Sequence, residues 1–552
     1  MAQTFTEVKT AFTNMSFTPD VPAAALSGTE YNAGLNVETD TRGIRSVLGD
    51  QNILDAITGT PIYVTGGYRA NDVWWYIIAT NDGRWWRVDE NATPVECTPN
   101  LTPLTGYSDT TSITEAWSGT TLLINDGLHP PMYLLGDASE FDQYSDDPAI
   151  DPVWNYNPQW SALTAGFMRI YNSPNVGSLL IAGNLASTDA ISSIVTQYPT
   201  TVRWSRVFPA LGAVPQSWQP TLNDVANELE VPVRGPVVDG FPCNGNFYVC
   251  SYWDTVIFSP LNFTSTTAPV LGVRLLNQGR GLLNQNCWAN ADSTVYGLDA
   301  RDIWVFDGNN FKSLGNQRVR NYFFDNLNPL YSDRVFLVNN TRRNQVEIYY
   351  PDMDSTGWCN KMLSYRYDLD IFNPPRDVAN ASHATEGPRY VTLNDSTEAF
   401  DKASRTIVYS RGVANTSLVE KDIGTTFLSN TPITSQFRRD NISLGLKYSQ
   451  QALLHRILPE VINIDQAGIP IEGVGNITVR IGGTNSVGTT VEDQPNGFQT
   501  PVVMPIATQN PWTQINQNAH RVVTIELNNI STTDTWQCTA VNWQFVPTED
   551  SR

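Results

Sequence analysis

Lysine is scarce in this sequence. The 552 residues include six lysines against 28 arginines, and the 55 acidic and 34 basic residues together give a formal net charge of −21. Because duplex DNA is a polyanion, a chain with this balance is not built to hold DNA through the release of counterions. Arginine suits fixed ion pairs and interfaces better than the strongly hydrated lysine does. The arginine excess therefore indicates either a surface committed to partners or a compositional bias of the gene.

Cysteine and histidine are also scarce, and they are scattered. The six cysteines are Cys97, Cys243, Cys250, Cys287, Cys359 and Cys538. None forms a CxxC pair, so neither a zinc site nor a dense disulfide framework is indicated, and we expect most of them to be small buried hydrophobic residues. The four histidines are His129, His383, His455 and His520. They form no HExxH motif, and we interpret them as structural.

Recognisable catalytic motifs are missing as well. No GxSxG or P-loop sequence occurs. A glycoside hydrolase needs two carboxylates across a cleft, which 55 acidic residues make impossible to identify from sequence. The nearest approach to a sialidase-type Asp-box is "STTDTW" at 531–536, where the acid and the glycine are misplaced. We therefore predict no enzyme activity and assign no catalytic, cofactor-binding or metal-binding residues.

Long hydrophobic runs and helical periodicity are likewise absent. No run approaches the roughly 18–20 apolar residues of a membrane helix, and "MAQTFTEVKTAF" at the start does not resemble a signal peptide. We expect synthesis in a cytoplasm and no membrane anchor. Apolar residues rarely recur at the spacing of a helix, residues 446–456 being a possible exception that could equally be a strand. The sequence therefore predicts an all-β protein.

What the sequence does contain is aromatic, strand-forming hairpins. In "WWYIIATNDGRWWRVD" (74–89), two arms rich in tryptophan flank the turn-forming run Asn81-Asp82-Gly83. Five apolar residues follow one another from Trp74 to Ile78, so the strand offers apolar groups to both faces. Such a strand is stable only when it is covered on both sides. The hairpin is thus predicted to be one layer in a stack of sheets.

The same pattern recurs irregularly along the chain. Similar hairpins occur at 122–135, 247–261, 293–315 and 334–352, with insertions at 137–160 and 208–236. Small antiparallel sheets covered on both faces favour a β-propeller over an array of β-sandwiches. Five tryptophans in these strands are then expected to be mostly buried: Trp74, Trp85, Trp253, Trp288 and Trp304.

The strand pattern changes near residue 433. Segments such as 476–487 and 521–547 alternate apolar and polar residues more cleanly, which is typical of half-buried strands. We therefore expect three parts. Residues 1–54 form an N-terminal arm that packs on the last domain, residues 55–430 form the propeller, and residues 431–552 form a C-terminal β-sandwich, or platform.

Four stretches, in this order, carry a resemblance to a known family. The first, 26–50, is marked by Asn36, Val37, Glu38, Gly43, Arg45 and Gly49. The second is "VRWS" (202–205) with Trp218 downstream. The third joins 235–261 to 299–315, and the fourth is Arg456-Ile457-x-Pro459 with His520-Arg521, where His520 replaces the usual glycine. Together they resemble the tail nozzle proteins of short-tailed bacteriophages, also called tail hub or packaged-DNA stabilisation proteins.

The resemblance implies a propeller joined to a platform that both chain ends build. It also implies a virion protein, without cofactors, that forms a hexameric ring below the portal and adaptor, contacts tail fibres or a needle, and lets double-stranded DNA pass through its lumen without specific binding. Such a nozzle helps to retain the packaged genome and conducts it during ejection. One alternative is a receptor-binding or glycan-cleaving phage tail propeller, in which clustered exposed tryptophans would form a sugar platform. Another is a secreted or cytoplasmic scaffold propeller of unrelated origin.

Overall fold

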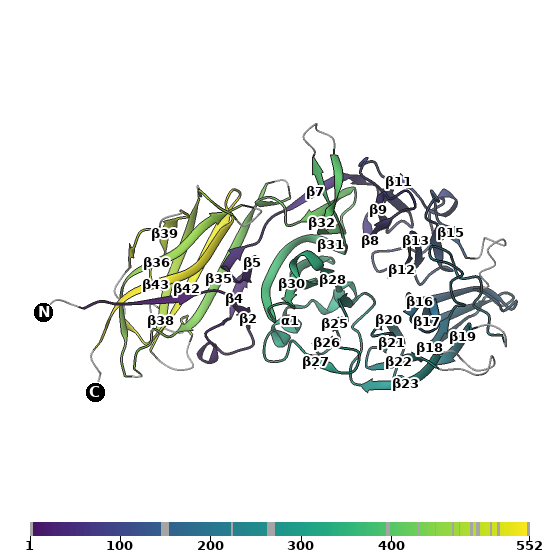
Figure 1. The fold of residues 1–552 in the computed structure, drawn as a ribbon, viewed down its shortest axis with the longest axis horizontal. Helices are drawn as coiled ribbons and strands as arrows, with labels where there is room; N and C mark the ends of the chain where they lie inside the picture. Colours follow the sequence, from purple (N-terminus) through teal and green to yellow (C-terminus); the bar gives the residue numbers. More distant parts are fainter. Residues whose placement is uncertain are drawn as a thin grey trace.

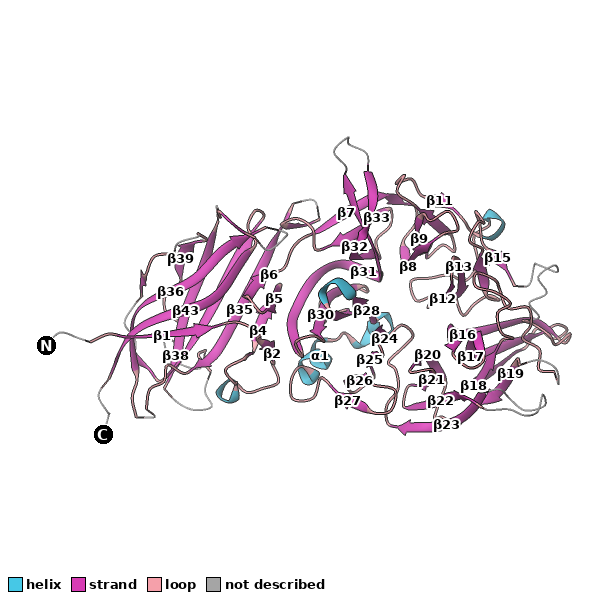
Figure 2. Cartoon of the chain, viewed as in Figure 1, coloured by secondary structure: helices cyan, strands magenta, loops and turns pink. Residues whose placement is uncertain are grey.

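The fold is almost entirely built of β-strands (Figures 1 and 2). It is a computed structural model of the 552-residue chain. It describes residues 4–144, 154–221, 225–261, 271–392, 398–428, 430–447, 449–465, 469–473, 475–485, 490–492, 497–507, 510–515 and 519–548. Parts of the insertions expected at 137–160 and 208–236 lie outside these residues. The all-β prediction is confirmed.

Five antiparallel sheets of four strands each form the blades of a propeller. The first two blades are β8 (Pro61–Tyr68), β9 (Trp74–Thr80), β10 (Trp85–Val88), β11 (Val95–Glu96) and β12 (Thr114–Ser118), β13 (Thr121–Asn125), β14 (Met132–Leu134), β15 (Asp142–Gln143). The third is β16 (Trp160–Ser173), β17 (Gly177–Asp189), β18 (Val195–Trp204) and β19 (Asn227–Glu230). The last two are β20 (Val237–Cys243), β21 (Asn246–Ser251), β22 (Asp254–Pro260), β23 (Leu271–Gln278) and β24 (Trp288–Ala291), β25 (Thr294–Leu298), β26 (Ile303–Phe306), β27 (Phe311–Ser313).

A curled sheet closes the ring and then continues away from it. Its first strands are β28 (Phe336–Asn340), β29 (Gln345–Tyr350), β30 (Cys359–Arg366), β31 (Ile371–Thr392), β32 (Glu398–Arg411), β33 (Thr416–Lys421) and β7 (Asp50–Ile57). β28 contacts β24 of the fifth blade, and β31 contacts β8 of the first. Beyond β7 the sheet runs on through β34 (Thr426–Phe427), β35 (Thr431–Ile442), β42 (Val522–Ser531), β38 (Asn476–Thr484) and β39 (Val502–Pro505), with β4 (Ala33–Leu35) beside β35.

The far end of that sheet packs on an eight-stranded sheet to form a β-sandwich. The second sheet holds β37 (Pro470–Ile471), β36 (Ala452–Ile464), β43 (Trp536–Pro547), β6 (Gly43–Ser46), β5 (Val37–Asp40), β1 (Thr6–Ala11), β40 (Thr513–Gln514) and β41 (Ala519–His520). β1 and β6 both pair with β43, so strands from the two ends of the chain lie side by side. Residues 452–456 of the ambiguous segment 446–456 are strand. The propeller with a C-terminal sandwich is thus the observed fold class.

The remaining elements are short. A small parallel pair joins β2 (Ser16–Phe17) to β3 (Glu30–Tyr31). The helical segments are η1 (Ala23–Ala25), η2 (Pro99–Leu101), α1 (Arg320–Asn326), η3 (Pro329–Arg334) and η4 (Thr341–Arg343). Within the described ranges, no helix is long and apolar enough to cross a membrane.

The tryptophan-rich hairpin has the predicted geometry. β9 is buried along its whole length, and the turn that follows it is closed by a hydrogen bond from the Gly83 amide to the Thr80 carbonyl at 3.0 Å. Gly83 has a φ of +82°, and a Cβ there would lie 1.9 Å from the carbonyl oxygen of Leu104. Only glycine satisfies both conditions.

The expectation that the five tryptophans are mostly buried is correct for four. Trp74, Trp85 and Trp304 are buried and Trp288 is half-buried. For Trp253 the prediction is wrong, because this side chain is 44% exposed. It lies in the turn between β21 and β22, outside the strands that neighbouring sheets cover.

Trp304→Ala is expected to lower the free energy of unfolding by about 3–5 kcal/mol, because the indole is fully buried and its removal leaves a cavity. The indole packs directly over Gly297, so no flexible side chain on that side can fill the space. Trp253→Ala is the matched control and should change stability by less than about 0.5 kcal/mol. Urea denaturation followed by circular dichroism measures both, and equal losses would contradict the burial argument.

Candidate functional site

The centre of the propeller is polar and closed by side chains. The first strand of each blade lies nearest to the axis and the fourth lies farthest from it (Figure 1). These first strands place Tyr63, Glu115, Arg169, Asp239 and Trp288 toward one another from the five blades in turn. The axis is therefore the place where residues distant in sequence converge.

An arginine–aspartate pair is the core of this polar centre. Arg169 donates to both carboxylate oxygens of Asp239, from Nε at 2.9 Å and from Nη2 at 2.6 Å. The same carboxylate accepts hydrogen bonds from the Trp288 indole N–H at 2.9 Å and from the backbone N–H of Asn286 at 3.1 Å. Asp239 raises the pKa of Arg169, although burial alone would lower it. The pair is fully hydrogen-bonded and links three blades, so its role is to hold these blades together.

Beside this pair lies the buried carboxyl group of Glu115, which forms no direct ion pair among the described residues but feels the nearby charge of Arg169. Burial raises the pKa of Glu115, which contacts Thr65, Tyr63 and Trp117 through hydrogen bonds that favour the ionised form. Burial likewise raises the pKa of Tyr63. The carboxyl group of Glu115 thus takes up a proton more readily in the folded protein than in the unfolded chain.

His383, on β31, is held neutral at the same end of the axis. Burial lowers its pKa to about 4. Its Nδ1 lies 2.9 Å from the Val64 carbonyl oxygen and donates to it, and its ring stacks on Tyr63 with centroids 4.1 Å apart. The other ring nitrogen, Nε2, is consequently an acceptor. Of the hydroxyls and thiols in the described ranges, none hydrogen-bonds to the imidazole.

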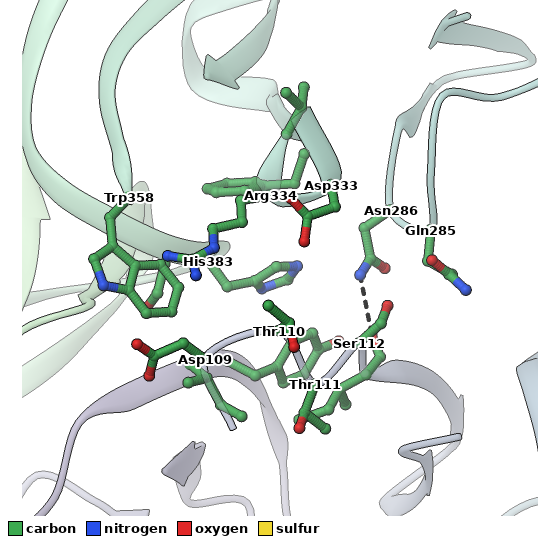
Figure 3. A pocket seen from close by; sticks show the side chains of 16 residues that line it. Asp109, Thr110, Thr111, Ser112, Gln285, Asn286, Asp333, Arg334, Trp358 and His383 are labelled. Atoms are coloured by element: carbon green, nitrogen blue, oxygen red, sulfur yellow. Dashed lines mark hydrogen bonds between the residues drawn. The ribbon is translucent and has the colours of Figure 1, made fainter. Parts of the chain in front are cut away.

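A pocket of about 60 Å³ opens beside His383. Figure 3 shows Asp333, Asn286 and the loop Thr110–Ser112 around it, with Arg334 and Trp358 on one side. Its lining is Ile62, Tyr63, Asp109, Thr110, Thr111, Ser112, Ile113, Gln285, Asn286, Asp333, Arg334, Val335, Phe336, Trp358, Ser382 and His383. The space suits a small polar group, and the imidazole in it is not joined to a nucleophile.

The other histidines and the cysteines occupy structural positions. The Nδ1 atom of His129 lies 2.8 Å from the Asp126 carboxylate, which raises the histidine's pKa. His455 stacks on Phe5, and His520 is buried. All six cysteines are buried, and burial raises the pKa of every thiol. Among the residues that the structure describes, no three histidine, cysteine or acidic side chains gather in a way that could hold a metal ion.

A second polar cluster joins the propeller to the sandwich. We call it the junction network, and it comprises Glu38, Arg45, Asp50, Arg343, Glu347, Arg376, Lys421 and Asp422. Glu38 and Arg45 stand on β5 and β6 of the sandwich, while the others lie on β7, η4, β29, β31, β33 and the residue after β33. The network holds four acids and four bases.

Arg376 and Asp422 lie at the middle of the junction network. Arg376 pairs with Asp50 and, at 2.5 Å, with Asp422. Asp422 also accepts Arg343 Nε at 2.9 Å, and Arg343 in turn binds Glu38 of the sandwich. A continuous series of ion pairs therefore connects Asp50, on the propeller side, to Glu38 of the sandwich.

Hydrogen bonds from neutral groups complete the network. The Tyr409 hydroxyl donates to Asp50 at 2.9 Å. Glu347 binds Lys421 and accepts the Tyr349 hydroxyl at 2.8 Å and the Asn340 amide at 2.7 Å. Burial opposes ionisation here, but Arg343 and Arg45 lower the pKa of Glu38 from 4.5 to about 2. The pKa values of Glu347 and Asp422 are likewise lowered by their cationic partners against the effect of burial, whereas burial raises the pKa of Asp50.

Sequence reasoning identified neither cluster. Glu38, Gly43 and Arg45 entered only as landmarks of a family resemblance. The partners Glu38 and Arg343 are 305 positions apart, and Arg376 and Asp50 are 326 apart. The only signal in the sequence is the excess of arginine, which does not say where the ion pairs form.

Comparisons with known proteins bear on the fold only. No family model and no curated protein matches the sequence. Among solved structures, the chain is similar to that of U3-55K (7% identity, 66% of this chain and 98% of the other, TM-score 0.36) and to BamB from Moraxella catarrhalis (10%, 75%, 100%, 0.29). It is also similar to the computationally designed Ika8 protein (9%, 67%, 98%, 0.31). From likenesses this weak we draw nothing about ligand or partner.

Glu115→Gln is expected to stabilise the protein more at pH 8 than at pH 5. The folded-state pKa of Glu115 is raised, so keeping this group ionised costs stability that grows as the pH rises above the ordinary carboxyl value. Glutamine removes the charge with little change of shape. Urea midpoints at the two pH values measure the effect, with Glu472→Gln, at an exposed site, as the control. A difference between variant and parent that is independent of pH would contradict the assignment.

Arg376→Met should lower the free energy of unfolding by about 3–5 kcal/mol at pH 7, because it leaves Asp50 buried without its ion-pair partner and removes one of the cations that hold Asp422. Lys402→Met is the control, since Lys402 pairs with Asp72 at an exposed site, where a pair contributes about 0–1 kcal/mol. Denaturant titration distinguishes the two.

Glu38 of the junction network contributes stability that decreases at acidic pH. The pKa of Glu38 in the folded protein lies below its unfolded value, so its contribution is complete above pH 4.5 and is lost as the pH falls toward about 2. A stability difference between the parent and Glu38→Gln that does not shrink as the pH falls through this window would contradict the description.

Proposed function

We propose that this protein is a tail nozzle, or tail hub, of a short-tailed bacteriophage. Six copies would form a ring beneath the portal and adaptor, extend the DNA channel, help to retain the packaged genome and conduct it during ejection. The protein would be made in the host cytoplasm and reside in the virion tail, where it contacts fibres or a needle. The sequence resemblance supports this proposal, and so does the combination of folds.

The proposal rests on the way in which the propeller is joined to the sandwich. The strands of this sandwich come from both ends of the chain. β1, β5 and β6 come from the start of the chain and share a sheet with β43 from its end. The junction network then ties β5 and β6 to the propeller side. A subunit of a tail must transmit force between neighbours without hinging, and such a joint suits that task.

The acidity of the chain is compatible with a conduit. Cationic walls would hold the duplex at many phosphates, whereas acidic walls repel it weakly at close range and leave it mobile. Salt screens such repulsion beyond about 8–10 Å. The arginines would then serve at fixed ion pairs, as they do in the junction network. In this proposal the protein binds DNA without specificity and catalyses no reaction.

A density map of the phage particle tests the proposal. We expect six copies of this chain in a closed ring below the adaptor, with heterologous contacts between neighbours. A bore lined mainly by arginine and lysine would contradict the conduit, and three copies in peripheral spikes would favour the receptor-binding alternative. Loss of host polysaccharide on incubation with the purified chain, abolished by replacing one carboxylate pair, would overturn the absence of catalysis.

A further inference from the structure

The pocket beside His383 presents hydrogen-bond acceptors that the protein itself leaves available. Asp333 is exposed, and its carboxylate points into the pocket (Figure 3). In the described part of the chain, no arginine, lysine or histidine forms an ion pair with it. The neighbouring Arg334 instead donates to the Gly357 carbonyl at 2.6 Å and lies over the Trp358 ring at 4.3 Å. The charge of Asp333 is therefore not neutralised locally.

The second acceptor is the imidazole of His383. Its Nδ1 hydrogen is committed to the Val64 carbonyl oxygen, so the neutral ring can only accept at Nε2. Because burial keeps its pKa near 4, the ring stays neutral throughout the physiological range. A carboxylate and a neutral imidazole thus face the same space. The hydroxyls of Thr110 and Ser112 stand opposite them and can also accept.

The walls and the size of the pocket restrict its ligand further. Trp358, Phe336 and Tyr63 supply aromatic surface, which favours alkyl groups and attracts cations. A volume of about 60 Å³ admits a few non-hydrogen atoms. An anion would be repelled by Asp333, and a metal ion would find fewer than three ligating side chains among the described residues. A small cation with several N–H donors and an alkyl stem suits the carboxylate, the imidazole and the aromatic walls, while the guanidinium of Arg334 is already bound by the Gly357 carbonyl and Trp358.

We propose that this pocket binds an alkylammonium group, with Asp333 and the Nε2 atom of His383 as its acceptors. The group is either the end of a lysine side chain on a partner protein or a free primary amine. The ammonium hydrogens would point to the carboxylate and the imidazole, and the alkyl stem would lie along Trp358. This site goes beyond the nozzle function and does not depend on it.

Saturation-transfer NMR with the full chain tests the proposal, using n-butylammonium as the probe and n-butanol as its neutral counterpart at constant ionic strength and pH 7. We expect saturation transfer from the protein to n-butylammonium and little transfer to n-butanol. Asp333→Asn should weaken the binding of n-butylammonium by about tenfold, because a charge-assisted hydrogen bond is lost. Asp354→Asn, at an exposed carboxylate that is not part of the pocket lining, should leave binding of n-butylammonium unchanged. His383→Phe, which keeps an aromatic ring, should also weaken binding, and circular dichroism checks that each variant is folded.

Equal transfer to the alcohol and the ammonium, or an undiminished signal in folded Asp333→Asn, would overturn the proposal and leave a pocket that holds water only. A second arm separates the two sources. Nα-acetyl-lysine N-methylamide carries the backbone of a protein lysine, whereas n-butylammonium does not. Binding of both indicates a partner's lysine, and binding of n-butylammonium alone indicates a free amine.

Discussion

The buried ion pairs around Arg376 and Asp422 are the interaction on which the architecture depends. Charges removed from water are costly unless each finds partners of good geometry. Here four acids and four bases meet where β5 and β6 of the sandwich reach the propeller side, beside the sheet that runs on from the propeller into the sandwich. Apolar contact alone would allow the two bodies several relative orientations, because it is not directional. The ion pairs are directional, so we attribute the fixed orientation of propeller and sandwich to them.

The propeller is stabilised in a related way at its axis, and this has a consequence for the proposed conduit. Arg169, Asp239 and Asn286 occupy the centre between the blades, and the pocket there measures only about 60 Å³. A DNA duplex cannot pass through such a space. In the proposed ring, the duplex therefore runs through a bore between six subunits, and each propeller is a solid wall of that bore. If the proposed ring forms, its channel would be made by the ring geometry and not by the propeller hole.

The sequence predicted local features and missed those that need distant residues. The turn at Asn81-Asp82-Gly83 and the doubly covered strand before it follow from short-range chemistry, and both are present. Trp253 was expected to be buried because apolar strands need cover on both faces, yet its place in a turn leaves it exposed. The junction network could not be predicted, since its members become neighbours only after the sheet from β28 to β7 has curled. The pocket could not be predicted either, because Asp333 and His383 are distant in the sequence and no motif contains both.

The distance between propeller and sandwich is the most direct measurement of the central claim, that the ionic joint makes them one rigid body. Leu330→Cys and Ile530→Cys place spin labels at exposed sites on the propeller side and the sandwich, and the six native cysteines are buried. Double electron–electron resonance should give one narrow distance distribution, which broadens when Arg376→Met is added. A broad distribution in the parent protein, or a narrow one that Arg376→Met leaves unchanged, would contradict the account.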